Sequence, residues 1–160
     1  MTDKWGRRLF KSGGVWLILL GLVHSISLFK KLAPANETER QLLGLMTSYK
    51  FNLMGSLRSI GDLFQGFSVA FMLAALVTGA LTLALSNERT SLLKRVALVI
   101  AIWLALMTGV SLYYFFPAPT SFLAVALILF VLAWLRLPGS DAKARETQEP
   151  IPHRAGPATT

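Results

Sequence analysis

Residues 96–116 read VALVIAIWLALMTGVSLYYFF, an apolar run that contains no charged side chain. At a rise of about 1.5 Å per residue, a helix of this length crosses the roughly 30 Å hydrocarbon core of a bilayer. Because hydrocarbon offers no hydrogen-bond partner to the backbone, a segment that spans it has to form an α-helix. With Lys94 and Arg95 at its start, the run predicts a transmembrane helix over about residues 93–116.

Three further apolar runs predict three more spanning helices, over about residues 13–32, 60–85 and 119–137. A soluble domain of 160 residues has too small a core to cover four such runs, and the hydrophobic share of 54% exceeds that of ordinary soluble domains. We therefore expect an all-α membrane protein in which residues 1–137 form a four-helix transmembrane bundle.

The first apolar run has a second interpretation, as a cleaved signal peptide. A basic start, an apolar stretch and then Ala33-Pro34-Ala35 resemble the three regions of such a signal. Two features argue against it. Lys30 and Lys31 separate the apolar run from the cleavage motif, and His24 lies inside the run.

The connection between the first two spans is too long for a plain turn and too polar to cross the membrane. Asn36 followed by Glu39 has the form of a capping box, which predicts the start of a helix. Apolar residues then recur at helical spacing, at Leu42, Leu45, Met46 and Tyr49. We expect a short amphipathic helix, lying at the membrane surface or folded down onto the bundle. A loop with incidental periodicity is the alternative.

The formal net charge of +8 comes from short clusters of bases beside the apolar runs. Such clusters are typical of topology signals and of contact with anionic headgroups, whereas a nucleic-acid groove needs a basic stripe on a polar fold. We expect no nucleic-acid partner. An even number of spans puts both termini on one side, and the positive-inside rule makes that side the cytoplasm of a bacterial inner membrane. The bases between residues 30 and 58 face outward in this topology.

The last segment, residues 138–160, reads PGSDAKARETQEPIPHRAGPATT. Its proline, its charge and its lack of apolar spacing predict a disordered cytoplasmic tail that carries no chemistry. The chain has no cysteine, which excludes disulfides and cysteine-ligated metal centres. Two histidines without cysteine do not make an ordinary zinc site, so we expect neither a metal nor a cofactor.

Polar residues of all four spans fall at one level, in the outer half of the predicted bundle. Polar groups in hydrocarbon are costly unless they pair, so they should turn toward one another. Arg58, Asp62 and Gln65 share one helical face if the second span extends back to residue 58. The candidate ligand-binding residues are His24, Arg58, Asp62, Gln65, Tyr113 and Tyr114. We expect His24 to bond with Asp62 and a tyrosine to close the network.

This arrangement predicts a polar pocket, open outward or sideways into the outer leaflet, for a lipid-like or quinone-like small molecule. A structural interpretation stands beside it. Asp62 then only caps its helix with Ser59, Arg58 only reaches toward headgroups, and His24 only makes an interhelical hydrogen bond. The protein would in that case be an accessory subunit of a larger membrane complex.

An enzyme is a third interpretation, with less support. His24 and Asp62 could transfer protons on an apolar substrate. The sequence identifies no nucleophile with an oxyanion donor, so no catalytic residue can be named.

Small residues four apart on the spans allow close helix approach. The pairs are Gly21 with Ser25, Gly66 with Ala70, and Ala75 with Gly79. They predict packing inside the bundle or a face for a homo-oligomer.

The stretch YKFNLMGSLRSIGDLFQGF at residues 49–67, with His24 before it and an aromatic pair before Pro117, resembles a family of small bacterial four-span membrane proteins. The matching positions are Phe51, Met54, Gly55, Arg58, Ser59, Asp62, Gly66, Phe67, Phe115 and Phe116. The chain departs from the pattern at Val23, where relatives have glycine, and at Leu63, where they have an aromatic residue. The resemblance implies a four-span inner-membrane architecture and no particular reaction.

Overall fold

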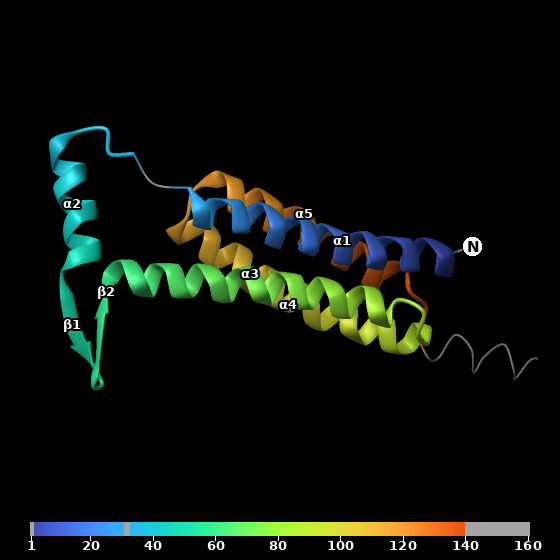
Figure 1. The fold of residues 1–160 in the computed structure, drawn as a ribbon. Helices are drawn as coiled ribbons and strands as arrows, with labels where there is room; N and C mark the ends of the chain where they lie inside the picture. Colours follow the sequence, from blue (N-terminus) through green and yellow to red (C-terminus); the bar gives the residue numbers. More distant parts are fainter. Residues whose placement is uncertain (1, 31–32, 140–160) are drawn as a thin grey trace, which may run out of the picture.

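The computed structural model describes residues 2–30 and 33–139. Within these residues the chain forms five α-helices and one two-stranded sheet (Figure 1). The elements are α1 (Thr2–Phe29), α2 (Glu37–Ser48), β1 (Lys50–Leu53), β2 (Ser56–Ser59), α3 (Ile60–Leu85), α4 (Thr90–Tyr114) and α5 (Pro117–Arg136). The tail that the sequence predicts to be disordered lies outside the described residues from residue 140 onward.

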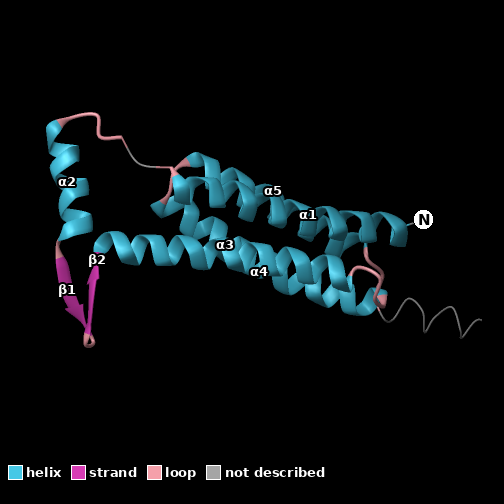
Figure 2. Ribbon diagram, viewed as in Figure 1, coloured by secondary structure: helices cyan, strands magenta, loops and turns pink. Residues whose placement is uncertain are grey.

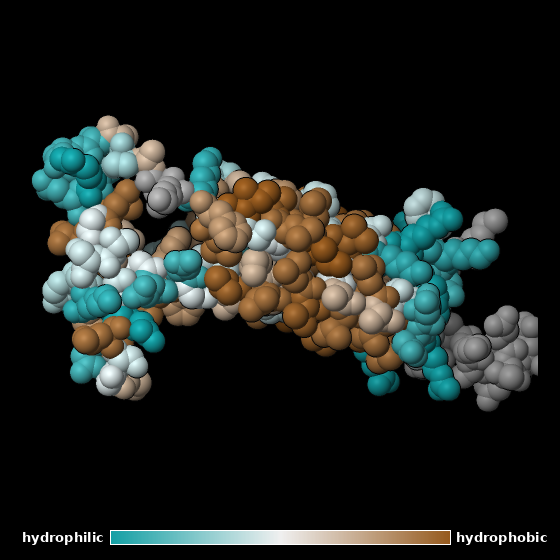
Figure 3. All heavy atoms as spheres, viewed as in Figure 1, coloured by the Kyte–Doolittle hydropathy of each residue, from teal (hydrophilic) through white to brown (hydrophobic). Residues whose placement is uncertain are grey.

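Helices α1, α3, α4 and α5 are long and apolar enough to cross a membrane. They run side by side in alternating directions, and on the face shown in Figure 3 their apolar side chains form a continuous band between two hydrophilic ends. Large apolar side chains cover the outside of these helices, so lipid has to surround them. The predicted fold class is confirmed: this is a multi-pass, all-α membrane protein with a four-helix transmembrane bundle.

The predicted spans and the observed helices differ mainly at the N-terminus. α3 covers residues 60–85 as predicted, whereas α1 begins at Thr2 instead of residue 13. Hydropathy marks only the part of a helix that lies in hydrocarbon, and the basic residues before it continue the same helix into water. α5 begins at Pro117, because proline at the first helical position lacks only an N–H that would have no partner there.

α1 is the central helix, because it packs along both α3 and α5, while α4 packs mainly on α5. Glycines allow the close approach of α1 and α3. A Cβ atom on Gly79 would lie 2.7 Å from the Gly14 carbonyl oxygen, and one on Gly21 would lie 2.7 Å from the Leu76 side chain. Of the small-residue pairs in the sequence, Ala75 with Gly79 is therefore buried in this contact, whereas Gly66 has open space around it.

The contact between α1 and α5 uses a second glycine face of α1, formed by Gly6 and Gly13, which lie seven residues apart. A Cβ atom on Gly6 would meet Leu137 at 2.9 Å, and one on Gly13 would meet the Phe130 ring at 2.8 Å. The Trp16 ring stacks on Phe122 at 5.3 Å between centroids. Its indole N–H also donates to the Phe122 carbonyl oxygen at 2.9 Å. The buried apolar side chains include Phe10, Leu17, Leu20, Leu93, Leu104, Leu123 and Phe130.

The two ends of the bundle carry different elements. The basal end holds the start of α1, the turn between α3 and α4, and the end of α5; the hairpin end lies opposite and holds α2 and the two strands (Figure 2). α2 confirms the predicted amphipathic helix, and its N-cap Asn36 accepts the Glu39 N–H at 2.8 Å. It lies across the direction of the bundle, with its C-terminal turn against the start of α3 at Gly61 (Figure 1).

The β-hairpin between α2 and α3 was not predicted. Its strands are antiparallel, with Lys50 opposite Ser59 and Phe51 opposite Arg58. The two turn residues, Met54 and Gly55, have φ values of 48° and 89°. The Asn52 side chain supports the turn by accepting the Gly55 N–H at 2.8 Å. The hairpin ends at Ser59, directly before the first residue of α3.

Candidate functional site

A groove of about 620 Å³ lies at the hairpin end, between the hairpin and the first turns of α3. Its lining residues are Lys50, Leu57, Arg58, Asp62, Leu63, Gly66, Phe67 and Ala70. The charged side chains come from the hairpin and the first turn of α3, and Leu57 of the hairpin lies among them, whereas the rest of the apolar and small lining follows along α3 from Leu63 to Ala70. The groove is therefore amphipathic along its length.

The length of α3 indicates that this groove crosses the membrane boundary. Its 26 residues make a helix about 39 Å long, which exceeds the roughly 30 Å hydrocarbon core. If Leu85 lies at the basal boundary, hydrocarbon ends about 20 residues earlier, near Gln65. Lys50, Arg58 and Asp62 then lie at headgroup level, and the Gly66 to Ala70 segment lies beside the acyl chains.

Asp62 is held by the start of its own helix. Its carboxylate accepts the Ser59 N–H at 2.9 Å, and the Ser59 hydroxyl accepts the Asp62 N–H at 3.0 Å. This reciprocal capping box satisfies two backbone donors that the first turn would otherwise leave free. Ser59 is only 2% exposed, so the corner between hairpin and helix is fixed. Asp62 thus caps its helix with Ser59 as predicted, and it also lines the groove.

The prediction that Arg58, Asp62 and Gln65 share one helical face is wrong. Arg58 lies in β2 rather than in α3, because Ser59 caps the helix and ends the strand. Arg58 and Asp62 nonetheless meet at the groove, from two different elements, while Gln65 is not among the lining residues. Within the described part of the chain, the Arg58 guanidinium donates only to the neighbouring Leu57 carbonyl oxygen, at 3.3 Å.

His24 lies apart from this groove, so the predicted bond to Asp62 does not form. Its ring packs edge-on against Phe71 of α3, with 5.1 Å between centroids. Phe71 is nine residues beyond Asp62, which is about 14 Å along the helix. The Nε2 atom of His24 is buried and has no hydrogen-bond partner among the described residues.

Tyr113 and Tyr114 do not close the predicted network either. They end α4, which packs mainly on α5. Their rings contact each other at 4.7 Å, and they are 81% and 73% exposed. Within residues 2–30 and 33–139, neither hydroxyl makes a hydrogen bond to His24 or Asp62.

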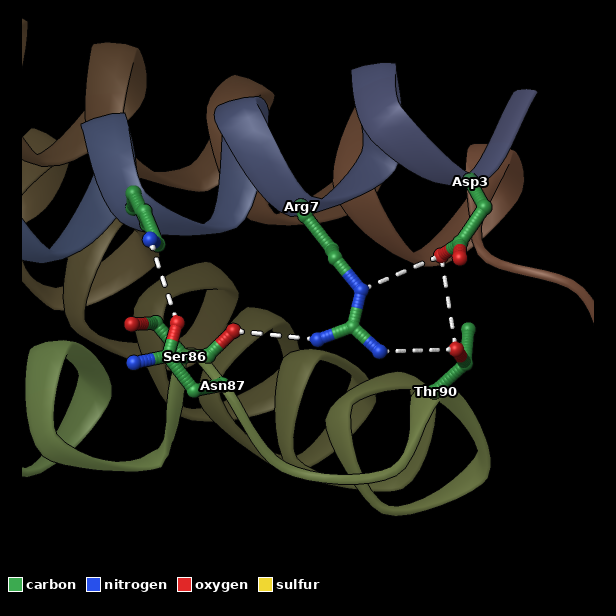
Figure 4. A network of polar contacts seen from close by, with 6 residues as sticks. Asp3, Arg7, Ser86, Asn87 and Thr90 are labelled. Atoms are coloured by element: carbon green, nitrogen blue, oxygen red, sulfur yellow. Dashed lines mark hydrogen bonds and ion pairs between the residues drawn. The ribbon is translucent and has the colours of Figure 1, made fainter. Parts of the chain in front are cut away.

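The most extensive polar network lies at the basal end, where sequence reasoning did not place one (Figure 4). The Arg7 guanidinium donates to the Ser86 carbonyl oxygen at 3.2 Å and to the Thr90 hydroxyl at 3.1 Å, and it pairs with Asp3 at 3.3 Å. Lys11 donates to the Asn87 side chain at 3.3 Å. The only sequence signal for this network is the spacing of Asp3 and Arg7 by four residues.

Comparisons with family models, with curated proteins and with solved structures gave no match for this chain. The resemblance of residues 49–67 to bacterial four-span proteins therefore stays a prediction.

Proposed function

We propose that the protein binds an anionic phospholipid in the groove at the hairpin end. The observation that carries this proposal is the order of side chains along the groove. Two cations, Lys50 and Arg58, come from the hairpin, and one carboxylate, Asp62, is already used as a helix cap. The polar end of the groove therefore favours a negatively charged group.

The other end of the groove suits an acyl chain. Gly66 and Ala70 leave the surface of α3 recessed, and a Cβ atom on Gly66 would have nothing within 4 Å. Leu63 and Phe67 supply an apolar wall beside this recess. A neutral quinone would use the apolar wall but not the two cations, so a phospholipid is the better fit.

The proposed setting is a bacterial inner membrane with both termini in the cytoplasm. Basal-end residues such as Arg7, Arg8 and Arg95 support this orientation, because cytoplasmic segments are enriched in Lys and Arg. The groove then opens at the outer leaflet. Outer-leaflet lipid reaches it sideways, without leaving the membrane.

Native mass spectrometry of the protein released from mild detergent tests this proposal. We expect the unmodified chain to retain a phosphatidylglycerol molecule in preference to phosphatidylcholine. The double variant Lys50→Gln, Arg58→Gln should lose about 30-fold in that preference, since each base near the surface contributes about 1 kcal/mol. Arg40→Gln is the matched control, because Arg40 lies at the same end but pairs with Glu37 on α2.

Three outcomes would contradict the proposal. The chain carries no lipid, it retains a quinone that the control and the groove variants lose equally, or the groove variant binds the anionic lipid as well as the unmodified chain does. If the protein co-purifies with a larger complex and these substitutions do not change that co-purification, the accessory-subunit interpretation is favoured instead. Turnover of a bound lipophile that His24→Ala and Asp62→Ala abolish would favour the enzyme.

A further inference from the structure

The basal end carries most of the positive charge in the described part of the chain. Its bases are Lys4, Arg7, Arg8, Lys11, Arg89, Lys94, Arg95 and Arg136. Among the described residues, the acids at this end are Asp3 and Glu88. Such an excess attracts anions, and the bilayer leaflet is the anionic surface closest to it.

Not all of these bases are free to bind a ligand. The Arg7 guanidinium already bonds to Ser86 and Thr90 and pairs with Asp3. Lys11 likewise donates to Asn87 (Figure 4). These two bases hold the helices together. The ligand-binding capacity of the basal end therefore belongs to the other bases.

Two of the remaining bases lie beside tryptophan rings. The Arg8 guanidinium carbon is 5.9 Å from the centroid of the Trp5 ring, on the same helix. The Lys94 ammonium of α4 is 5.9 Å from the centroid of the Trp134 ring of α5. Contact with an aromatic face steadies a cation without neutralising its charge. Each pair thus presents a positioned positive charge next to an indole.

The indole N–H groups of these pairs are also available. Trp16 donates its N–H to Phe122 inside the bundle, but within residues 2–30 and 33–139 the N–H groups of Trp5 and Trp134 make no hydrogen bond. Trp5 is 59% exposed. Tryptophan favours the boundary between hydrocarbon and headgroups, where its N–H can reach a phosphate or ester oxygen.

We propose that the Arg8–Trp5 and Lys94–Trp134 pairs are binding sites for anionic phospholipid headgroups in the leaflet at the basal end. In each site the base attracts the phosphate and the indole N–H donates to a lipid oxygen. Trp5 and Arg8 lie in the first two turns of α1, Lys94 in the second turn of α4 and Trp134 in the last turn of α5, so both pairs lie at the basal ends of spanning helices, which favours a lipid over a nucleic acid. These sites are separate from the groove, which lies at the opposite end of the bundle.

Quenching of tryptophan fluorescence by brominated lipids tests this inference. The protein is reconstituted into vesicles that contain brominated phosphatidylglycerol or brominated phosphatidylcholine at the same fraction. In a Trp16→Phe, Trp103→Phe background, the emission comes from Trp5 and Trp134 alone. We expect the relative association constant at these indoles to favour the anionic lipid about fivefold.

The double variant Arg8→Gln, Lys94→Gln should bring this preference to about one, because it removes the charge and leaves both indoles in place. The groove variant Lys50→Gln, Arg58→Gln is the matched control and should leave the basal preference unchanged. Since Trp16 also supports the α1–α5 contact, the same comparison is repeated in the unmodified four-tryptophan chain, where the change is smaller but has the same direction.

Equal quenching by the two lipids in the unmodified chain would overturn the inference. A preference that survives in the Arg8→Gln, Lys94→Gln variant would overturn it as well. If the groove variant alone abolished the preference at the basal indoles, the anionic lipid would bind at the hairpin end only.

Discussion

The two ends of the bundle use their polar residues in opposite ways. At the basal end, hydrogen bonds join residues far apart in the chain, as between Arg7 and Ser86. At the hairpin end, most polar groups bond to near neighbours, as Ser59 does with Asp62 and Ser25 with the Leu22 carbonyl oxygen, although Ser111 and Thr120 join α4 to α5 at 2.7 Å. The basal polar groups therefore hold α1 to the turn between α3 and α4, whereas those of the hairpin and the start of α3 set local geometry and leave cations free.

This contrast explains why the groove and the helix contacts occupy different parts of α3. The basal half of α3 is pressed against α1 at Gly79, and its hairpin half is open at Gly66. A helix surface that packs against another helix has no room for a ligand. The open face of the hairpin half of α3, at Gly66 and Ala70, is the part that lines the groove, whereas Phe71 of the same half packs on His24.

The largest effect should come from filling the close contact of α1 and α3. In Gly79→Leu, the first side-chain atom alone would lie 2.7 Å from the Gly14 carbonyl oxygen, so the helices have to separate. We expect a loss of about 3 kcal/mol in the free energy of unfolding, measured by detergent titration. Gly66→Leu, on the open half of the same helix, should change it by less than about 1 kcal/mol. Equal losses would show that the two halves of α3 do not differ in packing.

A smaller effect is expected from Arg7→Gln. The change removes charged hydrogen bonds to Ser86 and Thr90 and takes a cation from the C-terminal end of α3. We expect a loss of about 1–2 kcal/mol in the free energy of unfolding. Arg58→Gln is the matched arginine at the other end and should change stability by less than about 0.5 kcal/mol. The contrast between the ends is wrong if Arg58→Gln destabilises the protein more than Arg7→Gln does.

The smallest effect is expected from Ser59→Ala, which removes one half of the capping box. The cost should be about 1 kcal/mol, confined to the start of α3. Hydrogen exchange should therefore accelerate at the amides of the first turn of α3 and stay unchanged in its basal half. Ser121→Ala provides a control, because that hydroxyl bonds only to the Pro117 carbonyl oxygen of its own helix. Faster exchange along the whole of α3 would mean that the hairpin end is coupled to the rest of the bundle.

The sequence predicts the helices well because their signals are local. An apolar run as long as residues 60–85 has one stable structure in hydrocarbon. The helix starts at Asn36 and Ser59 are equally local signals, since each depends on an acidic residue three positions later. Ser59 and Asp62 form the full capping box, whereas Asn36 caps its helix by accepting the Glu39 N–H and the Glu39 carboxylate accepts the Ala35 N–H. These signals need no knowledge of which helices touch.

The hairpin could not be predicted from the sequence, because its turn lacks the usual sequence signal. A two-residue hairpin turn with positive φ at both positions is typically Asn-Gly, whereas here it is Met54-Gly55. The supporting asparagine, Asn52, lies two residues before the turn. The strands are also only four residues long, which is too short for a clear alternation.

The candidate site was predicted only in part, because depth in the membrane does not fix direction around a helix. Arg58 and Asp62 do line one groove, as their closeness in sequence suggests. His24 has a depth that sequence can estimate, but its side chain turns to Phe71 and not to Asp62. The pairing of Arg7 with Ser86 joins residues 79 positions apart and depends on how α1 packs against the α3–α4 turn.

The central place of α1 has a consequence for how the protein is made. A ribosome feeding the chain into the bilayer delivers α1 before α3, and α3 before α5. The glycines in the apolar part of α1, Gly13, Gly14 and Gly21, are therefore expected to face acyl chains until α3 and then α5 dock on them. Because glycine presents almost no side chain to lipid, each later helix displaces little from α1 when it docks.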